Sequence, residues 1–258
     1  MNIGHAFGKM NRNGLARFQG GILILSAMLF LCVPAAAQES DNNWHVTLMP
    51  FLMGSSIDGT ATVRGQKVEV DRAASDILAN LKFGSMIMGM ARKGDWGIGA
   101  DAVWMDLDAG GDATPPADLT FRQGLFSFYG LRRLGPAVDL TFGARINFLK
   151  ARLDMEGPSE ARYRQNKTWV DPVVGLCLHT LDDAPTQFQI YSEIGGFNTG
   201  SRYTWRVFPT VSFHLSSNSS LSLGYRWLYT DYEDGRGSTE FHYKMLVQGP
   251  LAGLILRF

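Results

Sequence analysis

The sequence has no excess of charge of either sign, little cysteine and, beyond its first 37 residues, no long hydrophobic run. Twenty-four basic residues balance 24 acidic ones, so no basic face for nucleic acid is indicated. No stretch after residue 37 approaches eighteen apolar residues, which excludes a helical membrane span in that part. The chain is instead rich in glycine (29 residues) and phenylalanine (16 residues), a composition that favours a β-protein.

The first 37 residues have the three parts of a secretory signal peptide. Lys9, Arg12 and Arg17 come first without any acid, followed by the apolar run Ile22 to Val33 and the small residues up to Ala37. Twelve apolar residues are too few to cross a hydrocarbon core of about 30 Å as a helix. We therefore expect cleavage after Ala37, leaving residues 38–258 as one domain.

Cleavage would also remove Cys32, one of the two cysteines. A lipoprotein signal at Cys32 is the alternative, but Leu31 stands where Gly or Ala is usual. The mature chain then keeps only Cys177, so no internal disulfide is expected in an oxidising compartment. Its net charge is −3, since loss of three basic residues leaves 21 against 24 acidic ones.

Period-two alternation of apolar and polar residues dominates the mature chain. Side chains on a strand point to opposite faces in turn, so each such segment has one apolar and one polar face. A soluble sandwich would show the same pattern, but these segments run for ten to fifteen residues and carry aromatics at the ends of their apolar faces, as membrane barrels do. The cleanest examples lie at 138–148, 203–215 and 221–229.

The connections between segments alternate in length, with short turns at 93–95, 134–136, 182–185 and 216–219. This pattern predicts an all-β, antiparallel up-and-down transmembrane barrel of about ten strands, with eight or twelve as alternatives, and both termini in the periplasm. A hairpin around Arg64 would raise the count to twelve if it joined the wall, and Pro250 predicts a bulge or kink in the last strand. The expected strands are 44–54, 81–92, 96–108, 118–133, 137–152, 167–181, 186–198, 202–215, 220–232 and 241–258.

The carboxyl end resembles the insertion signal of bacterial outer-membrane barrels. Gly253, Leu256 and Phe258 match that pattern, whereas Leu251 stands where a polar residue is expected. The resemblance implies that the last strand binds the barrel-assembly machinery and that the protein resides in the outer membrane, with membrane lipid and lipopolysaccharide as its surroundings.

Longer stretches resemble a family of uncharacterised bacterial outer-membrane β-barrel proteins and, more distantly, small barrels of the outer membrane protein A and W type. The resemblance covers essentially the mature chain and implies a fold and a location, with no activity and no functional residue attached. It is carried by residues 44–59, 83–84, 91–97, 169–175, 195–197 and 223–226.

Charged residues on the polar faces are the candidate functional residues, because they would line the lumen. Mixed signs in a narrow barrel are expected to pair and fill it; an aqueous eyelet lined by opposite charges is the alternative. In the segment 118–133 the pattern is irregular, and a bulge near Leu125 would exchange the faces beyond it. The candidates are Asp101, Arg122, Arg132, Asp139, Arg145, Asp171, Glu193, Arg206 and Arg226.

No pattern indicates catalysis. His242 has Asp231, Asp234, Ser238 and Glu240 close in sequence, but no motif accompanies them, and the histidines lack metal-ligand spacing. We expect no catalytic residue, no metal and no cofactor. The sequence favours a structural or narrow-pore role for small solutes; the alternative is a barrel that binds a ligand, modifies lipid A or cleaves proteins through its surface loops.

Removal of Phe258 tests the insertion signal. We expect the shortened protein to accumulate unfolded in the periplasm, because the terminal aromatic residue carries most of the resemblance to the signal. Outer-membrane fractionation and the shift in gel mobility on boiling measure this. Normal assembly of the shortened chain would remove the significance given to the terminus.

Overall fold

The structure is a computed structural model, and it describes residues 43–63, 66–72, 75, 81–111, 117–155, 161–180, 184 and 186–258. The predicted signal peptide, residues 1–37, lies outside these residues and stays a prediction. No helix within the described ranges is long and apolar enough to cross a membrane.

Twelve strands and one short 3-10 helix make up the described part of the chain. They are β1 (Trp44–Met53), β2 (Ser56–Val63), β3 (Gln66–Arg72), β4 (Leu81–Lys93), β5 (Trp96–Gly111), β6 (Ala117–Gly135), β7 (Val138–Met155), β8 (Ala161–His179), β9 (Thr186–Gly195), β10 (Tyr203–His214), β11 (Ser219–Asp234), η1 (Gly237–Thr239) and β12 (Phe241–Arg257).

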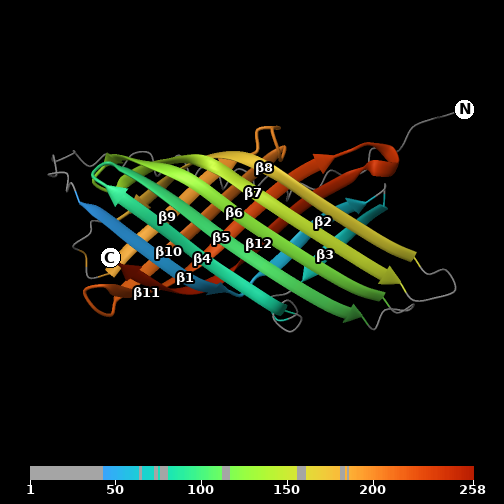
Figure 1. Cartoon of the computed structure of the whole chain (residues 1–258), viewed down its shortest axis with the longest axis horizontal. Coiled ribbons are helices and arrows are strands. Elements are labelled where there is room, and N and C mark those ends of the chain that lie inside the picture. The colour runs from blue at the N-terminus through green and yellow to red at the C-terminus, as the bar shows by residue number, and fades with distance from the viewer. Residues whose placement is uncertain are drawn as a thin grey trace, which may run out of the picture. The chain divides into compact units, whose positions relative to one another are not determined.

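The sheet closes on itself through antiparallel pairing of β1 with β12. Among the described strands, all except β2 and β3 form this closed barrel, so ten of the twelve make the wall. Neighbouring strands slope side by side across it, as β4 to β8 do in Figure 1. The predicted ten-stranded antiparallel barrel is therefore confirmed.

The predicted hairpin exists as β2 and β3 and joins the sheet through β12. Strand β2 continues the line of β1 along β12, because Met53 lies opposite Leu251 and Ser56 opposite Gln248 in one unbroken register. Strand β1 pairs with β4 on its other side, whereas β2 pairs there with β3. The hairpin thus extends the sheet without adding strands to the closed wall.

Pro250 does not produce a bulge in β12, since the pairing of β11 with β12 runs without a register shift. The amide of Gly54 donates to the Pro250 carbonyl at 2.9 Å, so the side of Pro250 that lacks an N–H faces the junction between β1 and β2. A missing ladder donor is tolerated where the partner strand is interrupted. The irregularity expected in β12 therefore appears in its neighbour.

The last residue completes the closure. The Phe258 amide donates to the Val46 carbonyl at 2.9 Å, and the Val46 amide donates to the Phe258 carbonyl at 3.1 Å. Gly253 lies opposite Phe51, and Leu256 lies opposite Leu48. The three residues of the predicted insertion signal are thus at the seam of the barrel; their role as a signal stays a prediction.

Burial follows the predicted alternation and identifies the two faces of the wall. On β7, Asp139, Thr141, Arg145 and Asn147 are buried in the lumen, while Phe142 between them is 45% exposed on the outer face. The outer face carries large apolar side chains on every side, among them Trp44, Leu52, Ile98, Phe128, Val170, Phe188 and Leu221. This apolar outer face is the surface that a bilayer covers.

A charge on the outer face should oppose membrane folding. We expect Phe142→Arg to lower the free energy of folding into lipid vesicles by about 2–4 kcal/mol, the cost of an arginine near the midplane. Urea titration in vesicles measures this, with Phe142→Leu as the control that keeps an apolar side chain. Equal stability of the two variants would mean that this face does not contact lipid.

Candidate functional site in the barrel lumen

The lumen is divided along its axis into three zones, each defined by its side chains. A belt of paired charges lies in the middle, an apolar layer lies between the belt and the extracellular end, and a cavity lies between the belt and the periplasmic end. We assign the end that holds Phe258 and the short turns at 94–95, 136–137 and 215–218 as the periplasmic end, because bacterial barrels have their short turns there.

Arg206 on β10 is the centre of the belt. Its Nη1 donates to both carboxylate oxygens of Asp101, at 2.9 and 3.0 Å, and its Nη2 donates to Glu193 at 3.1 Å. Its guanidinium also lies 4.8 Å from the centre of the Tyr191 ring. Because Asp101 is on β5, this one side chain ties opposite parts of the wall together.

Arg145 on β7 extends the belt to a further strand. It forms an ion pair with Glu193 and donates to Thr204 Oγ1 at 3.2 Å. The Tyr191 hydroxyl donates to Glu193 at 2.6 Å, and the Ser127 hydroxyl donates to Asp101 at 3.2 Å. Each belt carboxylate therefore accepts from an arginine and from a hydroxyl, which is what makes buried ion pairs tolerable.

Arg226 on β11 is a third buried arginine of this zone and is only 4% exposed. Its Nη2 has no hydrogen-bond partner among the described residues. Among the described residues, the belt thus consists of three arginines, Arg145, Arg206 and Arg226, and two acids, Asp101 and Glu193.

Asp171 belongs to a separate buried cluster that holds the turn between β9 and β10. It accepts from the Ser201 amide at 2.5 Å, the Ser201 hydroxyl at 3.0 Å and the Asn147 amide at 2.8 Å. Trp169 Nε1 lies within hydrogen-bond distance of both Asp171 and Ser201. The turn itself has positive φ at Gly196, where a Cβ atom would meet the Ser201 carbonyl at 2.6 Å.

On the extracellular side of the turn between β9 and β10, side chains of β8 and β11 meet directly. The Trp169 ring stacks on Tyr232 with 4.1 Å between ring centres, and Lys167 pairs with Asp234 at 2.6 Å. Further buried apolar residues lie on the extracellular side of the belt on their own strands: Val103, Met105, Leu125, Leu149, Leu228, Tyr243, Met245 and Val247. This zone is an apolar core, whereas the alternation predicted that polar side chains would face the lumen.

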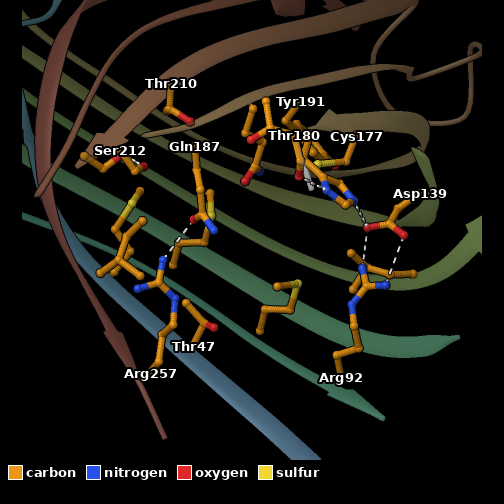
Figure 2. A pocket seen from close by; sticks show the side chains of 18 of the residues that line it. Thr47, Arg92, Asp139, Cys177, Thr180, Gln187, Tyr191, Thr210, Ser212 and Arg257 are labelled. Carbon is orange, nitrogen blue, oxygen red and sulfur yellow. Dashed lines mark hydrogen bonds and ion pairs between the residues drawn. The ribbon is translucent and has the colours of Figure 1, made fainter. Parts of the chain in front are cut away.

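The periplasmic zone is a cavity of about 620 Å³. Figure 2 shows Arg92, Asp139 and a histidine ring joined on one of its sides, with Arg257 and Gln187 paired on the opposite side. Arg92 binds Asp139 through both terminal nitrogens, and His179 Nε2 lies 3.4 Å from the same carboxylate. Cys177, the free thiol, also lines this cavity.

The structure therefore places seven of the nine sequence candidates on the lumen side. Five form or adjoin the belt, Asp171 holds the turn and Asp139 lies in the cavity. Sequence reasoning missed the uncharged partners Tyr191, Asn147, Trp169 and Ser201, because an aromatic or small polar residue has no distinctive pattern on a strand. It also missed Arg92 and Arg257, although both stand on alternating segments.

Arg122 and Arg132 do not face the lumen, which corrects their assignment. Their neighbours Leu125, Tyr129 and Leu131 are buried inside, and β5 pairs with β6 without the bulge considered near Leu125. Arg122 pairs with Asp106 at 2.9 Å on an exposed surface. Arg132 lies 4.7 Å over the Trp96 ring and 3.6 Å from Asp95.

The inversion of β6 has a packing reason. Its inner residues contribute to the filling of the lumen, and its outward glycines leave room for rings from the neighbouring strands. A Cβ atom on Gly124 would lie 2.7 Å from Trp104, and one on Gly130 would lie 2.8 Å from Phe142. On this strand the apolar residues, and not Arg122 and Arg132, therefore line the lumen, which is the reverse of the predicted orientation.

The described residues contain no group suited to hold a metal ion. None of their His, Cys, Asp and Glu side chains gather in groups of three or more suited to a metal ion. His242 lies 3.1 Å from Glu240 and 3.5 Å from Glu233 at the extracellular rim, as partly exposed pairs.

Comparisons with known proteins give structural matches alone. No protein-family model matches the sequence, and no curated protein does. The outer membrane protease OmpT from Escherichia coli is similar in structure with a TM-score of 0.52 at 9% identity, over 86% of this chain and 99% of that one. Ail, the attachment invasion locus protein of Yersinia pestis, aligns over 83% of this chain and 98% of its own, with a TM-score of 0.37 at 11% identity.

This chain has the fold of a bacterial outer-membrane β-barrel. The likeness to OmpT and the closed wall confirm the fold predicted from the sequence, and the outer-membrane location predicted with it agrees with that fold. Identities this low transfer no activity.

Substitution of the central arginine, Arg206, tests how much the belt contributes to the stability of the barrel. We expect Arg206→Met to destabilise the barrel by about 3–5 kcal/mol, because two buried carboxylates lose their partner. Arg122→Met is the matched control, since its exposed pair should contribute less than about 1 kcal/mol. Urea titration of both variants in vesicles gives the two values, and similar stabilities would show that the belt carries little of the folding energy.

Proposed function

We propose that this protein is a structural barrel of the outer membrane whose lumen is closed to solutes. The observation that carries the proposal is the filling of the lumen by the belt and by the apolar layer behind it. Arg145 and Arg206 are 0% and 1% exposed, and Leu125 and Leu228 are each 3% exposed. An ion that crossed would have to break buried ion pairs and then pass through an apolar zone.

Barrel size supports the same proposal. Eight-stranded barrels are just wide enough to be filled by side chains, and porins with water-filled channels have about sixteen strands or more. Ten strands stand close to the filled end of this range. Among the described residues, the acids of the lumen are engaged by arginine, hydroxyl or amide donors, which leaves none of these as a general base; we propose no catalytic activity.

The proposed partners follow from the two ends of the barrel. Exposed pairs at the extracellular rim, Arg202 with Glu233 and Lys244 with Asp231, would lie against lipopolysaccharide, whose phosphates need cations. The seam formed by β12 and β1 would be the part that the assembly machinery closes last. We propose no interaction with nucleic acid.

A narrow pore for small solutes is the second candidate, and the cavity favours it because the lumen is already hollow on the periplasmic side of the belt. That cavity reaches Arg206 and Tyr191 of the belt. A pore would then require only that the belt and the apolar layer rearrange.

Conductance in planar bilayers distinguishes the two candidates. We expect the wild-type protein to insert without producing reproducible current steps, and the double variant Arg206→Ala/Glu193→Ala to produce more frequent ones, because it removes belt side chains without changing net charge. Asp106→Ala/Arg122→Ala is the matched control on the outer face and should stay silent. Reproducible steps from the wild type would overturn the closed barrel and favour the narrow pore.

A further inference from the structure

The cavity on the periplasmic side has the size of a small-molecule site. Its volume of about 620 Å³ lies within the range of roughly 300–1,000 Å³ that such sites occupy. Thr47, Arg92, Thr180, His214 and Ser217, at or near the periplasmic ends of their strands and turns, are among its lining residues. A ligand would therefore enter from the periplasm, and the belt would be the closed inner end of the site.

The charge of the cavity lining is unbalanced. Four arginines line it, Arg92, Arg133, Arg206 and Arg257, together with three histidines, against a single carboxylate, Asp139, among the described residues. Arg92 and His179 both approach that carboxylate, and Arg206 is paired with the belt. Two arginines, Arg133 and Arg257, are left without an acidic partner among the described residues.

Arg257 is held in position by neutral groups. Its Nη1 donates to the Ser220 hydroxyl at 2.8 Å, and its Nη2 donates to the Gln187 side-chain oxygen at 3.0 Å. Because Ser220 is on β11 and Gln187 is on β9, the side chain extends from β12 across two neighbouring strands. Figure 2 shows its contact with Gln187. A fixed guanidinium with a positive charge that no carboxylate balances is a receptor for a carboxylate, sulfonate or phosphate group.

Apolar side chains lie beside Arg257. In the sheet register Thr47 is opposite both Arg257 and Met90, and Met49 in the next inward row is opposite Met88. Met49, Met88 and Met90 line the cavity with Ile255. Methionine side chains are flexible and polarisable, so this wall adapts to apolar groups of different shapes.

We propose that this cavity binds a small amphipathic anion taken from the periplasm. Its acidic group pairs with Arg257, and its apolar body lies against the methionine wall. The two features are adjacent on β12, β1 and β4, so one short molecule meets both. The site does not depend on the lumen being closed, since its residues lie on the periplasmic side of the belt.

Binding of naphthalene-2-sulfonate to the protein in nanodiscs tests the proposal. We expect saturable binding by calorimetry, and binding of 2-naphthol, which has the same ring without the permanent charge, to be weaker by about tenfold or more. Empty nanodiscs measure uptake by lipid alone. Equal heats from empty and loaded nanodiscs would show that the protein offers no such site.

Two variants locate the site. Arg257→Gln removes the charge, and Gln187→Glu places a carboxylate against Arg257 with almost no change in shape; each should weaken sulfonate binding by about tenfold or more and leave 2-naphthol binding unchanged. Gln187→Glu lies far in sequence from the terminal strand, so it remains informative if Arg257→Gln assembles poorly. Arg122→Gln on the outer face is the control. Wild-type affinity in a folded Gln187→Glu protein would overturn the assignment.

Discussion

The structure depends on one constraint: inside a bilayer, every backbone N–H and C=O must find a partner within the protein. A sheet meets this only by closing, and here the closure is made by β1 and β12, ending with the paired hydrogen bonds between Val46 and Phe258. The interruption between β1 and β2 falls opposite Pro250, which has no N–H to donate. Closure then determines which side chains face lipid and which are enclosed.

Enclosure by ten strands creates an interior that has to be filled. Arginine does this over the widest span, since Arg206 reaches from β10 to Asp101 on β5 and still pairs with Glu193. Buried charges are costly when unpaired, and the hydroxyls of Tyr191 and Ser127 supply the additional hydrogen bonds that the carboxylates need. The belt therefore connects opposite parts of the wall and, in our proposal, is also the barrier to solutes.

The two sides of the belt differ in character. Towards the extracellular end the short β9–β10 turn lets β8 and β11 approach, and the stack of Trp169 on Tyr232 fills the space above it. Towards the periplasm the side chains are methionines, serines and well-separated arginines, and a cavity remains. A barrel that is filled at one end and hollow at the other suits a protein that takes a ligand from one side without passing it through, and the proposed anion site follows from that asymmetry.

The sequence by itself indicated about ten wall strands with their approximate limits and the end with short turns. It also determined the inward direction of charges on strands with clean alternation, such as Asp139 and Arg145 on β7. Period two is a local property, so a strand with a uniform apolar face reveals its orientation without its neighbours. Only the tertiary structure decided β6, where apolar residues fill the lumen and glycines face out to accommodate Trp104 and Phe142. It alone decided that Arg257 lies beside Gln187, 70 positions away, because contacts across a barrel depend on closure and shear, which no single strand encodes.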